Sequence, residues 1–317
     1  MQLHLNINQP SDQTEKVYDT VIIGAGPAGI SGAIYLKRKG YRVAVVGVED
    51  GGQVATTASV ENYPGFSSIS GAELAQSYMQ HLNSLSVDVI SARVTDLIKT
   101  DSFETTLDNG QVLFSDTVLF ATGSTRRKLG VPGEDEFSGR GVAYCSICDG
   151  PFFADRDIIV VGGGNSAVES VLDLSKIAHS VTLIHRSTLR ADQVAIDQMM
   201  TLPNVNVRLA SVIDEIRGDG LVKEVVLRNN QTDATEIMPI DGLFIDIGSL
   251  PNSDLAAQLV TLNERREIIV DPSGRTDLPG FYAAGDVTDE PYKQIVVAAG
   301  RGASAALAIS DELNKRK

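Results

Sequence analysis

Two glycine-rich turns constrain the fold of this chain more than any other feature. The first, GAGPAG, begins at Gly24 directly after an apolar run at 20–23, and the second, GGGNSA, begins at Gly162. A helical stretch and a second apolar run follow each turn, so the same strand–turn–helix–strand unit occurs twice in the chain. The repeat predicts an α/β protein with two dinucleotide-binding domains.

The first turn matches the pattern G-x-G-x-x-G at Gly24, Gly26 and Gly29. The first glycine allows the sharp turn, the second lets backbone N–H groups reach a pyrophosphate, and the third lets the helix close on the strand. Glu49 follows the second apolar run of this unit, near the place expected for an acid that binds a ribose hydroxyl. A structural glycine turn without a nucleotide is the alternative interpretation.

The second turn fits the pattern G-x-G-x-x-A, with its small residues at Gly162, Gly164 and Ala167. After the expected strand at 181–184 there is no carboxylate, and the chain instead carries His185, Arg186 and Arg190. Two guanidinium groups near an adenosine ribose suit a 2′-phosphate, which favours NADPH over NADH. A solvated basic loop is the alternative interpretation.

The only two cysteines, Cys145 and Cys148, form a CxxC pair that Asp149 follows at once. A zinc site needs about four ligands, and the four histidines form no second pair with suitable spacing. Buried inert thiols are possible, but a redox disulfide is favoured because CxxC thiols have lowered pKa values. Asp149 could exchange a proton with a thiol, or it could serve as an N-cap or turn residue in the turn signal DGP.

Composition excludes several classes of function. The net charge of −14 makes the chain a poor general ligand for nucleic acid or for an anionic membrane surface. No run approaches the ~18 consecutive apolar residues of a membrane span. The polar segment 1–16 lacks the features of a secretory signal, although LHLNIN could add an edge strand. These features predict a cytoplasmic protein with no nucleic-acid or membrane partner.

Together with GGQVATTASVENYPG, ATGSTRRKLGVPGE and FYAAGDV, these motifs resemble the low-molecular-weight thioredoxin reductases. The resemblance runs along essentially the whole chain after residue 16. It implies a homodimeric enzyme of cell redox homeostasis that passes electrons from NADPH through FAD and the Cys145–Cys148 disulfide to a thioredoxin-like protein. It also implies two Rossmann-like, three-layer ββα domains, with the second inserted into the first.

The resemblance sets the expected domain boundaries. After an N-terminal extension at 1–16, the FAD domain would comprise 17–126 and 250–317. The NAD(P)H domain at 127–249 would lie between these two segments and carry the dithiol.

The resemblance also assigns roles to individual residues. Cys148 would be the thiol on the flavin side, Cys145 the thiol that attacks the partner's disulfide, and Asp149 the proton donor. The expected FAD site comprises Gly24, Gly26, Pro27, Ala28, Gly29, Glu49, Gly52, Gln53, Asn62, Ala121, Thr122, Gly123, Gly285, Asp286, Lys293, Gln294 and Ile295. The expected nicotinamide-nucleotide site comprises Gly162, Gly164, Asn165, Ser166, Ala167, His185, Arg186 and Arg190. Lys293, Gln294 and Ile295 would begin a helix whose positive end stabilises reduced flavin.

The chain departs from that family in two places. In the turn IGSLPNS, Ser249 stands where the family usually has histidine. The family's His-Arg-Arg loop here reads His185, Arg186, Ser187, so one guanidinium is missing. The motifs GGGNSAVE, PNS and PYKQIVVAAG, mostly in the C-terminal half, are similar to the flavoprotein subunit of alkyl hydroperoxide reductase. Only the segment 1–16 precedes the first expected strand, so we expect that protein's N-terminal thioredoxin-like extension to be absent.

Two alternatives to the thioredoxin reductase function therefore stay open. In the first, a related disulfide reductase uses NADH or a non-nicotinamide donor, or feeds a peroxiredoxin system. In the second, the protein is a flavin redox sensor whose dithiol does not turn over.

Overall fold

The computed structural model describes residues 16–57 and 59–316. The possible edge strand in LHLNIN lies outside these residues. The described chain forms two compact units, and the second is inserted into the sequence of the first. The first contains the described residues up to Ala55, then Ala72–Gly123 and the chain from Pro251 onward. The second contains Ser124–Leu250 and the described part of Thr56–Gly71.

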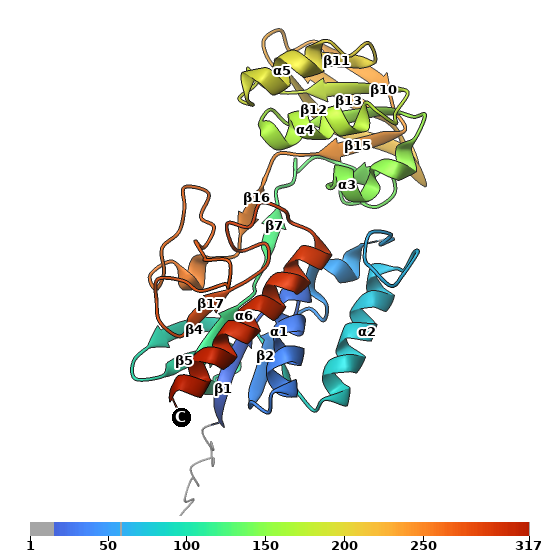
Figure 1. The fold of residues 1–317 in the computed structure, drawn as a ribbon. Helices are drawn as coiled ribbons and strands as arrows, with labels where there is room; N and C mark the ends of the chain where they lie inside the picture. The colour runs from blue at the N-terminus through green and yellow to red at the C-terminus, as the bar shows by residue number, and fades with distance from the viewer. Residues whose placement is uncertain (1–15, 58, 317) are drawn as a thin grey trace, which may run out of the picture. The chain divides into compact units, whose positions relative to one another are not determined.

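The first unit is built on one mixed sheet, in which Figure 1 labels β1, β2, β4, β5 and β17. The strands follow the order β3-β2-β1-β6-β5-β4, with β17 also paired to β6. These strands are β1 (Lys16–Ile23), β2 (Val43–Gly47), β3 (Asp88–Ser91), β4 (Val94–Lys99), β5 (Phe103–Leu107), β6 (Val112–Phe120) and β17 (Phe281–Ala283). The sheet forks at β6, because β5 pairs antiparallel with its first half and β17 pairs parallel with its last three residues. The strands from β3 to β6 run parallel, as the first glycine unit predicts.

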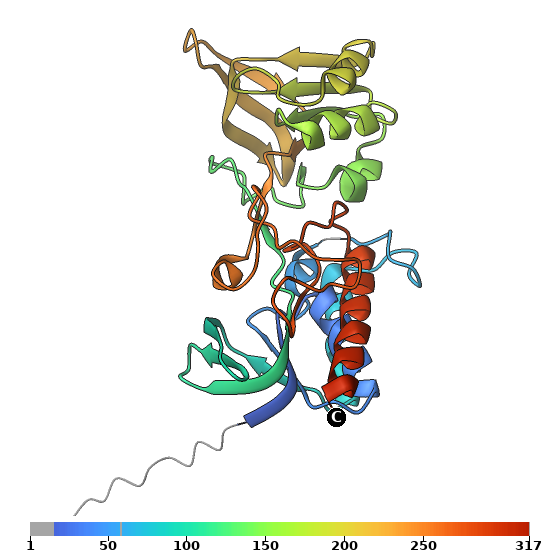
Figure 2. The ribbon, with the colours of Figure 1, turned by 60° about the vertical axis from the view of Figure 1, so that its left-hand side comes forward.

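Helices cover one face of this sheet. They are α1 (Pro27–Arg38), α2 (Gly71–Ser84) and α6 (Ile295–Arg316), with short 3₁₀ helices η1 (Gly52–Thr56) and η3 (Asp254–Ala256) in the connections. Figures 1 and 2 show α1 and α6 side by side, and a Cβ at Gly302 would clash with the Ala28 carbonyl. Alternation along β1 divides the core, since Ile22 faces these helices while Val21 and Ile23 pack on the opposite side.

The second unit has a parallel sheet in the order β11-β10-β9-β15-β8 and an antiparallel sheet in the order β12-β13-β14. The parallel strands are β8 (Val142–Ala143), β9 (Asp157–Val161), β10 (Ser180–Ile184), β11 (Val205–Arg208) and β15 (Gly242–Ile245). The antiparallel strands are β12 (Ser211–Asp219), β13 (Leu221–Asn229) and β14 (Thr235–Pro239). The helices are α3 (Ser146–Asp149), η2 (Gly150–Phe153), α4 (Asn165–Leu174) and α5 (Gln193–Met200).

Alternating side chains on β9 explain the three layers of this unit. Ile158 and Val160 pack against the helical layer, whereas Ile159 and Val161 join the core shared with the antiparallel sheet. The parallel sheet reverses its strand order between β9 and β15, and such a switch point is where open α/β sheets bind ligands. The expected α/β class, with parallel sheets and one domain inserted into the other, is confirmed.

Two short connecting strands, β7 (Ser124–Arg126) and β16 (Ser249–Pro251), pair with each other. The division between the units falls at Gly123/Ser124 and at Leu250/Pro251, a few residues from the boundaries expected at 126 and 250. The 56–71 segment groups with the second unit, which the sequence did not indicate. No helix among the described residues combines the length and the apolar character that crossing a membrane requires.

Candidate active site

The first glycine loop is closed on one side and open on the other. A side chain at Gly24, whose φ is +116°, would clash with the Ala121 carbonyl, and one at Gly29 would clash with the Gly24 carbonyl. Gly26 is the N-cap of α1, with φ −84° and ψ −178°, and a Cβ there would meet nothing within 4 Å. The N-terminus of α1 therefore has open space beside the Gly26 Cα, which leaves room for a pyrophosphate to approach the first helical turn.

Other glycines bring further predicted flavin residues to this loop. A Cβ on Gly52 would lie 3.1 Å from the Gly26 Cα, and one on Gly285 would lie 3.0 Å from the Ala28 Cβ. Glu49 is exposed just beyond β2, at the position expected for an acid that binds the ribose. The first unit thus assembles residues from four separate segments, namely 24–29, 49–53, 121–123 and 285–286. Their backbones meet at the open N-terminus of α1, an arrangement that suits a dinucleotide such as FAD.

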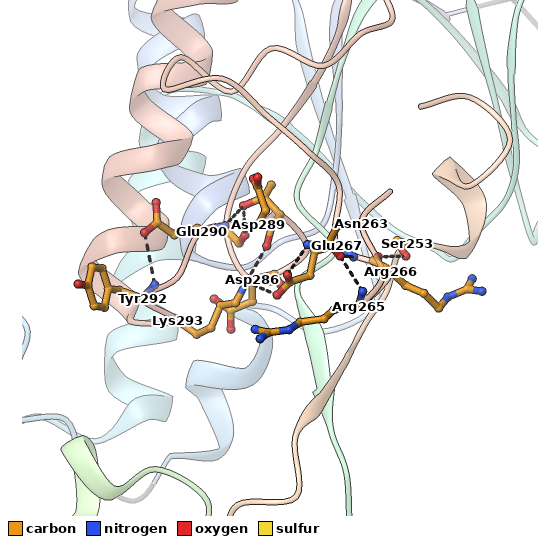
Figure 3. Close-up of polar contacts among 12 residues, drawn as sticks. Ser253, Asn263, Arg265, Arg266, Glu267, Asp286, Asp289, Glu290, Tyr292 and Lys293 are labelled. Carbon is orange, nitrogen blue, oxygen red and sulfur yellow. Dashed lines mark hydrogen bonds and ion pairs between the residues drawn. The ribbon is translucent and has the colours of Figure 1, made fainter. Parts of the chain in front are cut away.

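The Lys293 side chain reaches the backbone at Asp286, one of the predicted flavin residues (Figure 3). Its ammonium group lies 3.1 Å from the Glu267 carboxylate and donates to the carbonyls of Thr288, at 2.6 Å, and Asp286, at 3.3 Å. These bonds fasten the 286–288 turn to the chain that leads into α6. Helix α6 itself starts at Ile295. The carbonyl of the preceding residue, Gln294, accepts a hydrogen bond from the Ala298 N–H in the first turn of the helix.

Sequence reasoning missed Glu267, which only the folded chain brings to Lys293. Asn62 is the predicted flavin residue that belongs to the 56–71 segment, which groups with the second unit. Its role stays a prediction.

The second glycine loop repeats the geometry of the first. Gly164 is the N-cap of α4, with φ −99° and ψ −177°, and a Cβ there would also meet nothing within 4 Å. A Cβ on Gly162 would clash with the Asp246 carbonyl and lie 2.5 Å from the Ala167 Cβ, which explains why both residues are small. The exposed Ser166 lies on the first turn of α4.

The segment that follows β10 is fastened to this loop. Arg190 N–H donates to the Gly163 carbonyl at 2.6 Å, and Asp192 exchanges two hydrogen bonds with the Asn165 side chain, at 2.8 and 3.0 Å. The predicted nucleotide residue Asn165 is therefore engaged with Asp192. Arg186 and Arg190 both remain exposed beside the loop.

His185 is buried beneath the same loop. A Cβ on Gly163 would come within 2.5 Å of its ring, and its Nε2 lies 3.2 Å from the Ser187 hydroxyl. Burial lowers the pKa of this imidazole, and the neighbouring charges of Arg190 and Arg186 lower it further. His185 is thus held neutral, which leaves the two arginines as the cationic groups of the segment 185–190.

The two cysteines form a disulfide with a Cα–Cα distance of 5.3 Å. Cys145 is the N-cap of α3, and the Cys148 N–H donates to the Cys145 sulfur at 3.2 Å. This turn follows β8, and β8 pairs with β15 beside the switch point of the sheet. The second unit therefore carries the disulfide after β8 and the second glycine loop after β9, at the ends of two parallel strands that β15 separates in one sheet.

Asp149 ends α3 and precedes η2. The DGP segment is helical here, and the Asp149 side chain makes no cap bond to η2, so the N-cap interpretation is not supported. Burial raises the pKa of this carboxyl, while the Arg126 guanidinium and a backbone hydrogen bond at Cys145 oppose that shift. A carboxyl that retains its proton more readily than usual is better suited to donate one to a thiolate.

The backbone that leads into the dithiol is fixed by two charged residues that sequence reasoning did not single out. Arg126 donates to the Tyr144 carbonyl. Glu134, which is 2% exposed, accepts hydrogen bonds from the Tyr144 hydroxyl at 2.8 Å and from the N–H groups of Leu129 and Gly130. A buried carboxylate with three donors is strongly anchored, so it holds the chain entering Cys145 in place.

A second set of polar residues near the dithiol was also missed. The Ser146 hydroxyl lies 2.8 Å from the Ser170 hydroxyl, which donates to the Asp246 carboxylate at 2.6 Å. The three residues come from α3, α4 and the end of β15. Ser146 and Ser170 are 24 residues apart in the chain, and Ser170 and Asp246 are 76 apart, so no local motif could reveal these contacts.

Two glycine-loop nucleotide sites and a CxxC disulfide define a class of oxidoreductase that exchanges electrons between a nicotinamide nucleotide and a disulfide. The chain belongs to the pyridine nucleotide-disulphide oxidoreductase family, whose model matches residues 18–302.

Two kinds of relative support this assignment. The chain is 42% identical over 298 residues to the F subunit of alkyl hydroperoxide reductase from Staphylococcus aureus strain MRSA252, covering 93% of this chain and 59% of the relative. It thus spans about three fifths of the length of that protein. Thioredoxin reductase from Streptococcus pyogenes MGAS5005 matches with a TM-score of 0.91 and 37% identity, covering 95% of this chain and all of the other. The Giardia duodenalis thioredoxin reductase matches with a TM-score of 0.90 and 31% identity, with the same coverage. Both expected resemblances are confirmed.

Proposed function

We propose that this protein is an FAD-dependent reductase that takes electrons from NADPH and passes them through Cys145–Cys148 to the disulfide of a thioredoxin-like protein. The observation that carries the proposal is the disulfide at α3, which follows β8 in the same parallel sheet whose strand β9 leads into the second glycine loop. We assign FAD to the first unit and NADPH to the second.

The first unit would hold FAD in the cradle formed by the loops at Gly24–Gly29, Gly52 and Gly285. When bound, FAD supplies a carrier that accepts a hydride and hands an electron pair to the disulfide. Lys293 would keep the turn at Asp286 in position through its contacts with two carbonyls and Glu267. The N-terminal end of α6 would place its positive dipole toward the flavin.

The dithiol chemistry follows from the surroundings of each sulfur. The Cys148 N–H that points at the Cys145 sulfur would stabilise a Cys145 thiolate, the species that attacks a partner's disulfide. Attack forms a mixed disulfide between Cys145 and the partner, and the Cys148 thiolate then displaces the reduced partner. Asp149, with its raised pKa, would supply the proton to the departing thiolate.

A protein acceptor is favoured by apolar side chains beside the disulfide. Ile147, between the two cysteines, is 62% exposed, and Phe152 in η2 is 51% exposed. Apolar groups next to a reactive disulfide suit a docked protein surface more than a small charged oxidant. The thioredoxin reductases of similar structure favour a thioredoxin-like acceptor.

A second candidate acceptor is a peroxiredoxin system, favoured by the 42% identity to the F subunit of alkyl hydroperoxide reductase. NADH is a second candidate donor because Ser187 stands where an additional arginine would favour NADPH. A cytoplasmic homodimer is also part of the proposal, and sedimentation analysis of the purified protein tests the dimer.

A coupled assay tests the proposed reaction. The FAD-loaded protein is supplied with NADPH or NADH and with either a thioredoxin or a peroxiredoxin plus peroxide, and nicotinamide oxidation is followed. We expect faster turnover with NADPH and thioredoxin. Turnover only with the peroxiredoxin arm would select the second acceptor. Flavin reduction without turnover of any disulfide protein would contradict the proposal and favour a redox sensor.

A further inference from the structure

A chain of three polar side chains links the dithiol turn to the parallel sheet of the second unit. The Ser146 hydroxyl follows Cys145 directly and lies 2.8 Å from the Ser170 hydroxyl on α4. Ser170 is 5% exposed and donates to Asp246, the residue after β15, at 2.6 Å. Because the Ser170 hydrogen is committed to Asp246, the Ser170 oxygen accepts from Ser146. The chain therefore runs in one direction, from Ser146 to the carboxylate.

Asp246 is firmly held at its end of the chain. Its N–H donates to the Val161 carbonyl at 2.8 Å, so its backbone continues the pairing of β15 with β9. Burial raises the pKa of its carboxyl, while the hydrogen bond from Ser170 and the charge of Arg126 act in the opposite direction. The charge of Arg126 also lowers the pKa of Asp149, against the effect of burial.

Helix α4 anchors α3 at both ends. At the first turn the anchor is the Ser146–Ser170 hydrogen bond. At the far end, Gly150 lies so close to α4 that an added Cβ would be 3.0 Å from Leu174 and 3.6 Å from Ile177. A helix of four residues cannot hold its own geometry in water, so these external contacts fix the turn on which both cysteines lie.

We propose that Asp246 is a positioning residue for the redox dithiol, acting through Ser170 and Ser146 to hold the first turn of α3 in the geometry that closes the Cys145–Cys148 disulfide. None of the three side chains needs to contact either sulfur for this role. Holding the turn raises the effective concentration of one thiol at the other, which stabilises the disulfide relative to the dithiol. This inference rests on the proposed redox role of the dithiol.

The test measures the equilibrium between this disulfide and glutathione. In the balanced reaction the Cys145–Cys148 bond breaks, two glutathione thiols supply two electrons and two protons, and one oxidised glutathione forms. The full-length protein is equilibrated in glutathione buffers at pH 7, quenched with acid, alkylated, and analysed by mass spectrometry. We expect Ser146→Ala to lower the equilibrium constant for disulfide formation roughly three- to tenfold, because a looser turn lowers the effective concentration.

The variants are chosen to separate positioning from general damage. Ser170→Ala should lower the constant at least as much as Ser146→Ala, since it removes both hydrogen bonds. Ser146→Thr keeps the hydroxyl and should remain within about twofold of the parent protein. Ser175→Ala at the C-cap of α4 and Asp241→Asn at the other end of β15 are matched controls, and both should leave the constant unchanged.

A double-mutant cycle tests whether Asp246 acts through Ser146. Asp246→Asn should lower the constant, and the double variant Asp246→Asn/Ser146→Ala should lose no more than Ser146→Ala alone. Losses that multiply would show that Asp246 acts independently, which would overturn the chain. The proposal would also be overturned if the equilibrium constants of Ser146→Ala and Ser170→Ala stayed within about twofold of the parent value. An equally large decrease of the constant in Ser175→Ala would overturn it as well.

The outcome is independent of catalysis by the loaded enzyme. The measurement uses neither nicotinamide nor a protein partner. A protein that shows these shifts but reduces no disulfide protein would refute the proposed function and leave this inference standing. Normal turnover of a disulfide protein, together with unchanged equilibrium constants in the Ser146 and Ser170 variants, would support the proposed function and refute this inference.

Discussion

The two glycine loops share one backbone design, but the chain that follows each loop differs in charge. Gly26 and Gly164 are both N-caps with extended backbone and open space where a Cβ would stand. After β2 the chain presents the exposed acid Glu49, whereas after β10 it presents Arg186 and Arg190. Under the proposed function, each loop would provide a general phosphate site, while the end of the second strand would select the nucleotide.

The two sheets also differ in what they present beyond the nucleotide loop. In the first unit, β17 leads into the turn at Gly285 and Asp286, which Lys293 fastens from the segment that precedes α6. In the second unit, β8 leads into the disulfide. Similar sheets thus support a proposed flavin site in one unit and a redox dithiol in the other.

The largest expected effect comes from removing the group that only the second unit carries. Cys145→Ser and Cys148→Ser should each lower turnover with a disulfide protein by about a thousandfold or more, because serine oxygen does not take part in thiol–disulfide exchange. FAD content should stay unchanged, as the first unit is untouched. The coupled assay and the flavin absorbance measure the two effects. Activity within tenfold of the parent in either variant would show that electrons take another route.

A matched pair of substitutions in the loops tests whether the two sites are independent. Gly26→Val should lower FAD content about tenfold or more, because the added methyl groups occupy the proposed phosphate space. Gly164→Val should keep FAD and weaken NADPH binding. Both positions have negative φ, so each variant should lose only about 1 kcal/mol of stability from a poorer N-cap.

Flavin absorbance, NADPH titration and thermal unfolding separate these outcomes. If Gly164→Val lost FAD while Gly26→Val kept it, the assignment of nucleotides to the two units would be reversed.

The charge difference between the two loops predicts a smaller change in specificity. Replacing both Arg186 and Arg190 by alanine should lower the ratio of kcat/KM for NADPH over NADH roughly 10- to 100-fold, the value of about one charge-assisted hydrogen bond. The value of kcat/KM for NADH should change little. Arg208→Ala provides a control, because its guanidinium is paired with Glu236 at 3.6 Å. An unchanged ratio in the double variant would indicate a solvated basic loop.

The smallest expected effect is a change in the titration of His185. Burial and the charges of Arg190 and Arg186 lower its pKa from the ordinary 6.5, so Arg190→Ala should raise the pKa part of the way back. Because the folded protein binds this proton less tightly than the unfolded chain, His185 reduces stability as the pH falls below 6.5. NMR titration of the imidazole signal measures the shift. A pKa above 6.5 in the parent would contradict the buried, neutral ring.

Local motifs reveal residues whose contacts lie within one short segment of the chain. They miss residues whose partners are far away in the sequence. The loops at Gly24 and Gly162 lie within single strand–turn–helix units, so periodicity and glycine spacing identified them. The bonds of Ser170 with Ser146 and Asp246 join three separate elements, and the pairing of Glu267 with Lys293 joins two distant loops. Such contacts depend on which elements become neighbours in the fold. The turn was one of the alternatives that the sequence left open for DGP, and the structure is helical there because α3 contacts α4.

The central claim is that a flavin in the first unit passes electrons to the disulfide of the second, and an anaerobic titration of the FAD-loaded protein with NADPH tests it most directly. The parent protein should take up about two equivalents of NADPH per flavin before the yellow absorbance is fully lost, because flavin and disulfide each accept one electron pair. The Cys145→Ser/Cys148→Ser variant should take up about one. Equal uptake by both proteins would contradict the account, since it would mean that the disulfide receives no electrons from the flavin.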